Sequence, residues 1–176
     1  MNQIIIQGVG IIALLFVIFS FQKNKRVTLL LFMLTGLVLF VVHYSLLNAW
    51  TGALMNLIEA GMVFVAFKKE TKPWAQKKFW PYIFILFFII AGLFTAKTLV
   101  DFFPVLAQTF GAIAVWQKNP RAIRFIMLVP RPLWFIYNFI VGSYAGMAAE
   151  IFILLSVLTG IIRFDILGKL PKKAKL

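Results

Sequence analysis

Seven long hydrophobic runs, joined by short connections, take up almost all of this 176-residue chain. About 20 residues at a rise of 1.5 Å per residue cross the hydrocarbon core of a bilayer, so runs of this length indicate membrane-spanning helices. With 62% hydrophobic and 13% charged residues, little sequence is left for a soluble domain. We therefore predict an all-α membrane protein that lies in a lipid bilayer and has seven transmembrane helices. The predicted spans are 3–21, 27–47, 51–67, 79–96, 101–117, 122–141 and 144–165.

The positions of the charges predict the orientation of the chain. The net charge is +13, and all but two of the 18 basic residues lie on one side if the N-terminus is outside and the C-terminus cytoplasmic. The exceptions are Lys97, outside, and Arg131, within a span. The positive-inside rule favours this orientation. The basicity is then a topology signal, and we expect no nucleic-acid partner. The basic residues on the cytoplasmic side are Lys23, Lys25, Arg26, Lys68, Lys69, Lys72, Lys77, Lys78, Lys118, Arg121, Arg124, Arg163, Lys169, Lys172, Lys173 and Lys175.

An internal repeat divides the seven spans. The hexad FQKNKR at 21–26 returns as WQKNPR at 116–121, and each hexad separates one hydrophobic run from the next. A repeated unit of this kind predicts two parallel triple-helix bundles joined by a linker helix. We assign the first repeat to 1–67, the basic cytoplasmic loop and linker helix to 68–100, the second repeat to 101–165, and a basic cytoplasmic tail to 166–176.

The repeat also pairs residues between the two units. After a one-residue slip in the second helix the spacing is 94, so Gly52 corresponds to Gly146, a pair of small residues that favours close helix approach. The same spacing places His43 opposite Tyr137 and Asn56 opposite Glu150. Because the chemistry changes at these two pairs, we expect function to depend on them.

Ionisable residues inside the spans are the main candidates for a functional site. A charged side chain at the centre of a bilayer costs at least about 2.5 to 3.5 kcal/mol, so such groups normally face a cavity or a partner. Helical rise places His43, Asn56, Asn138 and Glu150 in an outer polar ring, and it places Glu59 and Arg131 deeper, as a candidate acid–base pair.

Each candidate also has a structural interpretation. His43 and Asn56 are equally compatible with hydrogen bonds that hold neighbouring helices together, and Glu59 with Arg131 is compatible with a structural ion pair. Glu150 is the hardest to interpret as purely structural, because an unpaired carboxylate in the membrane needs a proton, a cation or a donor. Trp134 is either a stacking surface for a solute or part of the core.

Three prolines lie inside the predicted spans, at Pro104, Pro130 and Pro132. Each removes a backbone donor and interrupts the helical hydrogen bonds. The two alternatives are a static kink and a hinge for gating, and the argument for a hinge is that Pro130 and Pro132 flank Arg131.

Several classes of function are disfavoured. The chain has no cysteine, no zinc-binding histidine motif, no P-loop and no nucleophile elbow. We therefore expect neither an enzyme nor a catalytic residue, and neither a cofactor nor a metal site.

Longer stretches resemble a known family. The segment QGVGIIALLFVIFSFQKNKR at 7–26, the stretch LWFIYNFIVGSYAG at 133–146 and the final IIRF at 161–164, together with His43, Asn56 and Glu150, resemble the bacterial inner-membrane family YgjV. The resemblance covers nearly the whole chain and implies a location in the bacterial inner membrane.

The 3+1+3 plan is more distantly similar to the SWEET and PQ-loop transporters. That resemblance implies a substrate between the bundles, with Asn56 at one conserved asparagine position and Glu150 at the other. It also implies that Tyr137 or Trp134 is the aromatic residue of the sixth helix. The prolines of the first repeat are missing, which argues against a sugar as substrate.

Two hypotheses follow. The first is a transporter or facilitator of a small polar solute, in which His43, Asn56, Trp134, Tyr137, Asn138 and Glu150 bind the solute, and Glu150, Glu59, Arg131, Pro104 and Pro130 serve proton coupling or gating. The second is a membrane receptor that binds a ligand in the same cavity without passing it. The sequence is compatible with a homo-oligomer and does not fix the oligomeric state.

Overall fold

The computed structural model describes residues 2–21, 26–69, 71–115, 117 and 119–168. Within these residues the regular structure is helical throughout, which confirms the all-α prediction. Residues 22–25 of the first hexad, 116 and 118 of the second, and 169–176 of the basic tail lie outside the described residues, including Lys23, Lys25, Lys118 and Lys169. The helices are α1 (Gln3–Phe21), α2 (Arg26–Leu46), α3 (Trp50–Lys68), η1 (Pro73–Gln76), α4 (Trp80–Thr95), η2 (Leu99–Asp101), α5 (Phe102–Val115), α6 (Pro120–Ile126), α7 (Pro130–Val141), α8 (Tyr144–Gly160) and η3 (Ile161–Ile166).

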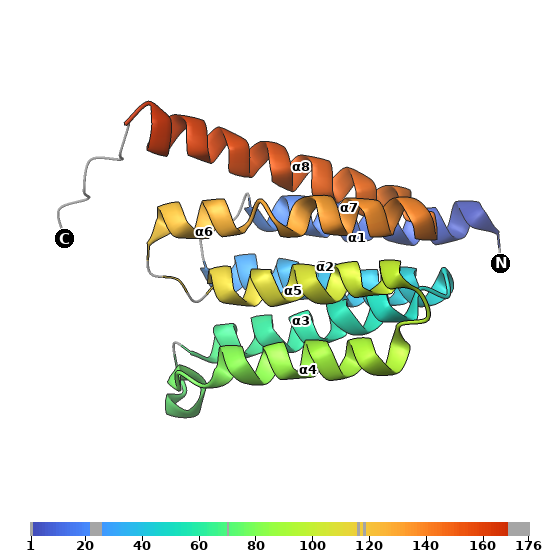
Figure 1. Cartoon of the computed structure of the whole chain (residues 1–176), viewed down its shortest axis with the longest axis horizontal. Helices are drawn as coiled ribbons and strands as arrows, with labels where there is room; N and C mark the ends of the chain where they lie inside the picture. The colour runs from blue at the N-terminus through green and yellow to red at the C-terminus, as the bar shows by residue number, and fades with distance from the viewer. Residues whose placement is uncertain (1, 22–25, 70, 116, 118, 169–176) are drawn as a thin grey trace.

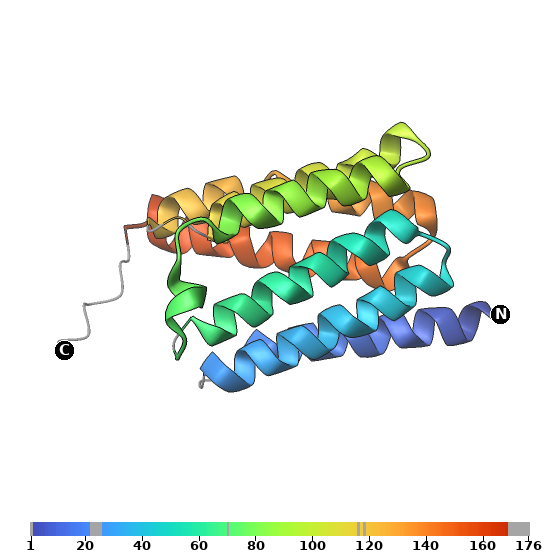
Figure 2. The ribbon, with the colours of Figure 1, turned by 90° about the horizontal axis from the view of Figure 1, so that it is seen from below.

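The long helices run along one axis of the molecule, so the connections gather at two ends (Figures 1 and 2). One end, which we call the N-terminal end, holds the start of α1 and the turns α2–α3, α4–α5 and α7–α8. The other, which we call the basic end, holds the α3–α4 connection, the start of α6 and the end of η3. The described lysines and arginines concentrate at the basic end, with Lys97 at the N-terminal end.

Neighbours in the bundle follow the order of the chain. Helix α2 packs against both α1 and α3, and α7 packs against both α5 and α8. Helix α4 packs against α3 and α5, and further contacts between α1 and α8 and between α3 and α5 close the arrangement. Six helices, all the long ones except α4, thus surround a common interior.

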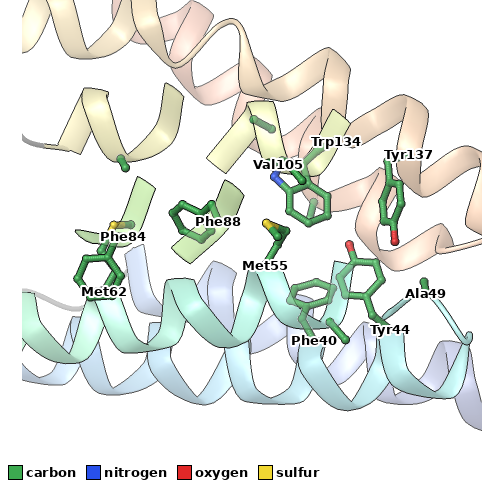
Figure 3. Packing of buried hydrophobic residues seen from close by; sticks show 14 of the residues in the cluster. Phe40, Tyr44, Ala49, Met55, Met62, Phe84, Phe88, Val105, Trp134 and Tyr137 are labelled. Atoms are coloured by element: carbon green, nitrogen blue, oxygen red, sulfur yellow. The ribbon is translucent and has the colours of Figure 1, made fainter. Parts of the chain in front are cut away.

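The buried core is built from apolar side chains of several helices (Figure 3). Phe88 of α4 and Met55 of α3 are fully buried, and Phe40 and Tyr44 of α2 lie near Trp134 of α7. Large apolar residues are also exposed along the outer sides of most helices. Exposed apolar surface of this extent suits a chain whose surroundings are lipid.

Within the described part of the chain, five helical segments are long and apolar enough to cross a membrane, and two more are apolar but shorter. The shorter ones are Trp80–Thr95 and Leu99–Ala114, for which full spans are predicted from the sequence. At 1.5 Å per residue, the 16 residues of α4 extend about 24 Å, less than the roughly 30 Å hydrocarbon core. The five segments that qualify are Gln3–Ser20, Val27–Leu46, Trp50–Lys68, Pro120–Val141 and Tyr144–Ile166.

The predicted sixth span, 122–141, is not one continuous helix. Helix α6 ends at Ile126 and α7 begins at Pro130, with a tight turn between them in which Val129 N–H donates to the Ile126 carbonyl. A proline ring clashes with the carbonyl four residues before it, so Pro130 and Pro132 favour the start of a new helix. Pro104 likewise lies in the first turn of α5, where a proline is tolerated, and not in a helix interior as predicted.

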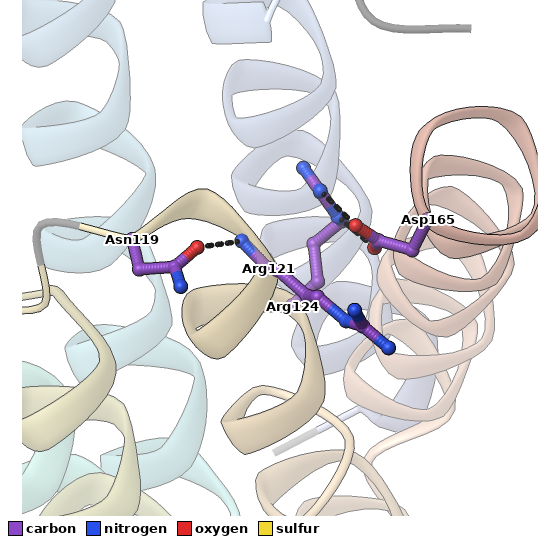
Figure 4. Close-up of polar contacts among 4 residues, drawn as sticks. All are labelled: Asn119, Arg121, Arg124 and Asp165. Atoms are coloured by element: carbon purple, nitrogen blue, oxygen red, sulfur yellow. Dashed lines mark hydrogen bonds and ion pairs between the residues drawn. The ribbon is translucent and has the colours of Figure 1, made fainter. Parts of the chain in front are cut away.

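The basic ends of α6 and α8 are tied together (Figure 4). At Ile161 the α-helical hydrogen bonding of α8 gives way to the π-helical turn η3. Arg124 of α6 donates from Nε and Nη2 to the two carboxylate oxygens of Asp165 in η3, each at 2.7 Å. Asn119 caps α6 by accepting the Arg121 N–H at 3.0 Å. A bidentate pair of this kind fixes the relative position of the two segments.

We expect the close packing of α4 on α5 to be sensitive to one methyl group. A Cβ added at Gly92 would lie 2.5 Å from Cγ2 of Val105, a side chain that is stiff at χ1 and buried. Gly92→Ala should therefore lower the free energy of unfolding by about 1 to 3 kcal/mol, through overpacking. The measurement is thermal unfolding in detergent.

Gly8→Ala is the matched control for this substitution, because a Cβ at Gly8 meets nothing within 4 Å. Alanine favours a helix over glycine, so the control should be neutral or stabilising. Equal loss of stability in the two variants would contradict the packing argument.

Candidate functional site

A cavity of about 110 Å³ lies in the middle of the bundle. Its lining comes from α1, α2, α3, α5, α7 and α8, the six helices that surround the interior. The apolar residues Val17, Met33 and Ile153 continue it towards the basic end. The lining residues with polar or aromatic polar side chains are Tyr44, Asn56, Glu59, Gln108, Arg131, Trp134 and Glu150.

The two acids and the base of the cavity do not pair as the sequence predicts. Arg131 Nη1 donates to Glu150 Oε2 at 2.9 Å, so Glu150 is neither unpaired nor separated in depth from Arg131. The predicted pairing of Arg131 with Glu59 is therefore wrong, because the ion pair is formed by Arg131 and Glu150. The Arg131–Glu150 bond uses one nitrogen and one oxygen, and Arg131 Nε is buried without a partner. This pair is less completely satisfied than the bidentate pair at the basic end.

Glu59 is bound by an amide. Gln108 Nε2 of α5 donates to Glu59 Oε2 of α3 at 2.6 Å. A hydrogen bond from a neutral amide stabilises a carboxylate but does not cancel its charge. Of the described lining residues, two are carboxylates and one is a guanidinium, so the cavity has one more ionisable acid than base.

Asn56 and Trp134 also line the cavity, as the site hypothesis requires. Asn56 Nδ2 donates to the Gly52 carbonyl of its own helix at 2.9 Å. Its Oδ1 is then the acceptor that it can present elsewhere. Trp134 is 5% exposed, and its ring centroid lies 5.9 Å from that of Tyr44, so it also belongs to the core.

His43 lies in a packed layer at the N-terminal end, outside the cavity lining. Its Nδ1 is 2.9 Å from the Ile6 carbonyl, and a carbonyl only accepts, so Nδ1 carries the proton. Its Nε2 is 2.8 Å from Ser143 Oγ, which accepts the N–H of Gly146 at 3.2 Å. His43 thus links α2 to α1 and to the start of α8, which is the helix-holding role that the sequence analysis left open.

Tyr137 has the corresponding position in α7, and it too reaches the start of a helix. Its hydroxyl accepts the Gly52 N–H at 2.9 Å. The first amides of a helix lack intrahelical acceptors, and Ala49 at the start of α3 offers no side-chain cap. Tyr137 therefore caps α3 from another helix, directly, while the shorter His43 reaches the equivalent amide of α8 through the Ser143 hydroxyl.

The close approach predicted at both glycines is present. A Cβ at Gly52 would lie 2.8 Å from the ring of Tyr137, and one at Gly146 would lie 2.5 Å from Asn138 Oδ1. Gly10 similarly admits His43, since a Cβ there would lie 2.7 Å from its ring. The N-terminal end is closed by contacts that tolerate no added methyl group.

Asn138 is held in this layer as well. Tyr44 donates its hydroxyl to Asn138 Oδ1 at 2.6 Å, and both residues are buried. The predicted solute-binding residues therefore divide into two groups. One group lies together on the N-terminal side of the cavity: His43, Tyr137 and Asn138. The other group lines the cavity: Asn56, Trp134 and Glu150.

The Arg131–Glu150 pair also borders a second hollow. A groove of about 290 Å³ between α7 and α8 is lined by Phe135, Ile136, Leu154 and other apolar residues, and by Arg131 and Glu150 themselves. The ion pair therefore separates the central cavity from an apolar groove.

Ionisable residues within membrane-spanning helices normally pair with one another or face a cavity, as Arg131 and Glu150 do. The family model for a bacterial inner membrane protein, Imp-YgjV, matches residues 4–167. The chain belongs to the YgjV family of bacterial inner membrane proteins. This confirms the predicted family. Neither the comparison with curated proteins nor that with solved structures gives a match.

Three residues of the candidate site in this chain were not among the predicted site residues: Gln108, Tyr44 and Ser143. Gln108 is a polar residue within a predicted span, which is a usable signal. Tyr44 lies 94 residues before Asn138, so the repeat spacing already pairs them. Ser143 directly precedes a predicted span, where a serine indicates a helix N-cap, but nothing in the sequence indicates its contact with His43.

We expect the cap that Tyr137 provides to contribute to stability. Tyr137→Phe leaves the buried Gly52 N–H without its acceptor and should lower the free energy of unfolding by about 1 to 3 kcal/mol. The matched control is Tyr82→Phe in α4, because Tyr82 is 73% exposed. Thermal unfolding of both variants in detergent is the measurement, and an unchanged melting temperature for Tyr137→Phe would contradict the cap.

Proposed function

We propose that this YgjV-family protein transports or facilitates the passage of a small polar solute across the bacterial inner membrane. The central cavity supports this best: six helices surround it and line it with polar and ionisable groups deep within an apolar bundle. Groups of that kind are expensive in a membrane and normally serve an ion or solute path. The proposal places the N-terminus outside and the basic end in the cytoplasm, in line with the positive-inside rule.

The proposal includes a 3+1+3 architecture, with α1–α3 and α5–α8 as two parallel units and α4 as the linker. The packing of α2 between α1 and α3, and of α7 between α5 and α8, supports it. The crossed contacts support it further: Tyr137 of the second unit caps α3 of the first, and His43 of the first reaches Ser143 at the start of α8. Two equivalent units related by a pseudo-twofold axis make reciprocal contacts of this kind.

Access to the cavity differs between the two ends. Towards the N-terminal end, the hydrogen bonds of Tyr44, Tyr137 and His43 lie between the cavity and the turns. Towards the basic end the lining consists of the apolar side chains of Val17, Met33 and Ile153, which form no hydrogen bonds. Alternating access then requires the crossed contacts to break and re-form, while the cavity keeps its polar residues.

Glu150 is the proposed proton-coupling residue. Its carboxylate is bonded to Arg131, so protonation of Glu150 would release the guanidinium to a solute or to Glu59. The pair therefore offers two arrangements of charge within one cavity, which is the requirement for coupling a proton to a conformational step.

A flux measurement tests the proposal. Purified protein in proteoliposomes should raise the entry of at least one solute from a panel of glycerol, urea, glycine and ethanolammonium at least about ten-fold over empty liposomes. In the double variant Arg131→Gln/Glu150→Gln the increase should be lost, because the ion pair at the centre of the cavity is removed. Removing both partners leaves neither of them as an unpaired buried ion, so the variant should fold.

Tyr82→Phe is the control for reconstitution, since that exposed side chain is far from the lining. Ligand-dependent stabilisation without flux would support the receptor alternative. Equal flux in the double variant and the parent would remove the pair from the mechanism, and no flux and no binding would leave only a structural role for the polar groups.

A further inference from the structure

We infer that the solute of the central cavity is a small organic cation of the alkylammonium class. This inference rests on the proposed function and adds the charge and size of the solute. Four observations carry it: the surplus of acid in the lining, the hydrogen-bond acceptors, the aromatic faces and the volume.

The surplus of acid comes first. Glu59 and Glu150 face one guanidinium, that of Arg131, and Arg131 is bonded to Glu150. Glu59 receives only the neutral amide of Gln108 among the described residues. A carboxylate in a low-dielectric site needs a counter-charge or a proton. A cationic solute beside Glu59 supplies that counter-charge.

The hydrogen-bonding groups of the lining point to the same class. Asn56 donates from Nδ2 to the Gly52 carbonyl, which leaves its Oδ1 as an acceptor. Both carboxylate oxygens of Glu59 are acceptors when the group is ionised. Arg131 donates from Nη1 to Glu150, on the side of the cavity formed by α7 and α8. An ammonium group has three donors and no acceptor, so it complements the acceptors of Asn56 and Glu59.

Aromatic rings line the same space. Phe40, Tyr44 and Trp134 all border the cavity, and Figure 3 shows the three side chains close together between α2 and α7. The ring centroids of Phe40 and Tyr44 are 5.9 Å apart, as are those of Tyr44 and Trp134. The face of an aromatic ring attracts a cation, most strongly where water is excluded.

The volume limits the size of the solute. The cavity measures about 110 Å³. An engineered protein cavity of about 150 Å³ accepts benzene, which has six heavy atoms, so this one suits a solute of about four or five. Larger amino acids, sugars and nucleosides exceed it.

A proton and the organic cation can each neutralise the surplus negative charge of the cavity. With no solute, a proton on Glu59 or Glu150 removes the surplus charge, and Arg131 of α7 and Gln108 of α5 are the other groups that face them. A cation that enters replaces the proton, so the two compete. The exchange needs no further reactant.

Three solutes of matched size test the inference: ethanolammonium, ethylene glycol and glycolate, which are cationic, neutral and anionic at neutral pH. The readout is the melting temperature of the purified protein in detergent at constant ionic strength. Ethanolammonium should raise the melting temperature by about 3 to 6 °C at ten times its dissociation constant, and the other two should not.

The variants locate the effect. Glu59→Gln keeps the size of the side chain and a hydrogen-bond acceptor for Gln108, and loses the charge, so it should fold and should weaken ethanolammonium binding at least about ten-fold. Phe40→Leu removes one aromatic face from the lining and should weaken binding about three- to five-fold. Tyr82→Phe should bind as the parent does.

The outcomes separate this inference from the proposed function. Equal stabilisation by ethylene glycol, or stabilisation by glycolate alone, overturns the cation while leaving transport of a polar solute standing. Equal stabilisation by ammonium or sodium chloride overturns the organic class. No stabilisation by ethanolammonium also overturns the inference, and the flux of the uncharged panel members then decides the proposed function.

Discussion

Hydrocarbon offers no hydrogen-bond partner, so the polar side chains inside this bundle depend on partners within the protein. Those partners come from other helices: Arg131 on α7 binds Glu150 on α8, and Glu59 on α3 binds Gln108 on α5. Apolar side chains exchange one neighbour for lipid at little cost, whereas a polar group that loses its partner finds no replacement in hydrocarbon. The order of helices around the cavity therefore depends on a few polar contacts more than on the extensive apolar core.

The helical content and most of the spans could be predicted, because hydrophobic runs of spanning length are rare outside transmembrane helices. The only sign of the break between α6 and α7 in the sequence is the pair of prolines at 130 and 132. Prolines at these positions are equally compatible with one kinked helix and with two separate helices. The partner of Arg131 could not be predicted. Helical rise gives the depth of a residue but not the rotation of its helix, and a long arginine side chain reaches either acid.

Positions 94 residues apart carried more information than either position alone. Asn56 and Glu150 both line the cavity, and Tyr44 and Asn138 hydrogen-bond to each other. The difference between His43 and Tyr137, which led us to expect that function depends on this pair, has a simpler geometric cause. The phenol of Tyr137 reaches the first amides of α3 directly, whereas the shorter imidazole of His43 reaches those of α8 only through the Ser143 hydroxyl. The solute-binding hypothesis consequently narrows to the residues of the cavity itself.

The bidentate contact between Arg124 and Asp165 has a mechanical consequence. Helix α6 is separated from α7 by a turn, and η3 differs from α8 in helix type, so the backbone hydrogen bonding changes next to each of the two end segments. The contact fastens these segments to each other across the two helices. A displacement of one end segment must therefore carry the other with it. The chain thus has one ion pair that joins two helices at the basic end and another at the centre of the bundle.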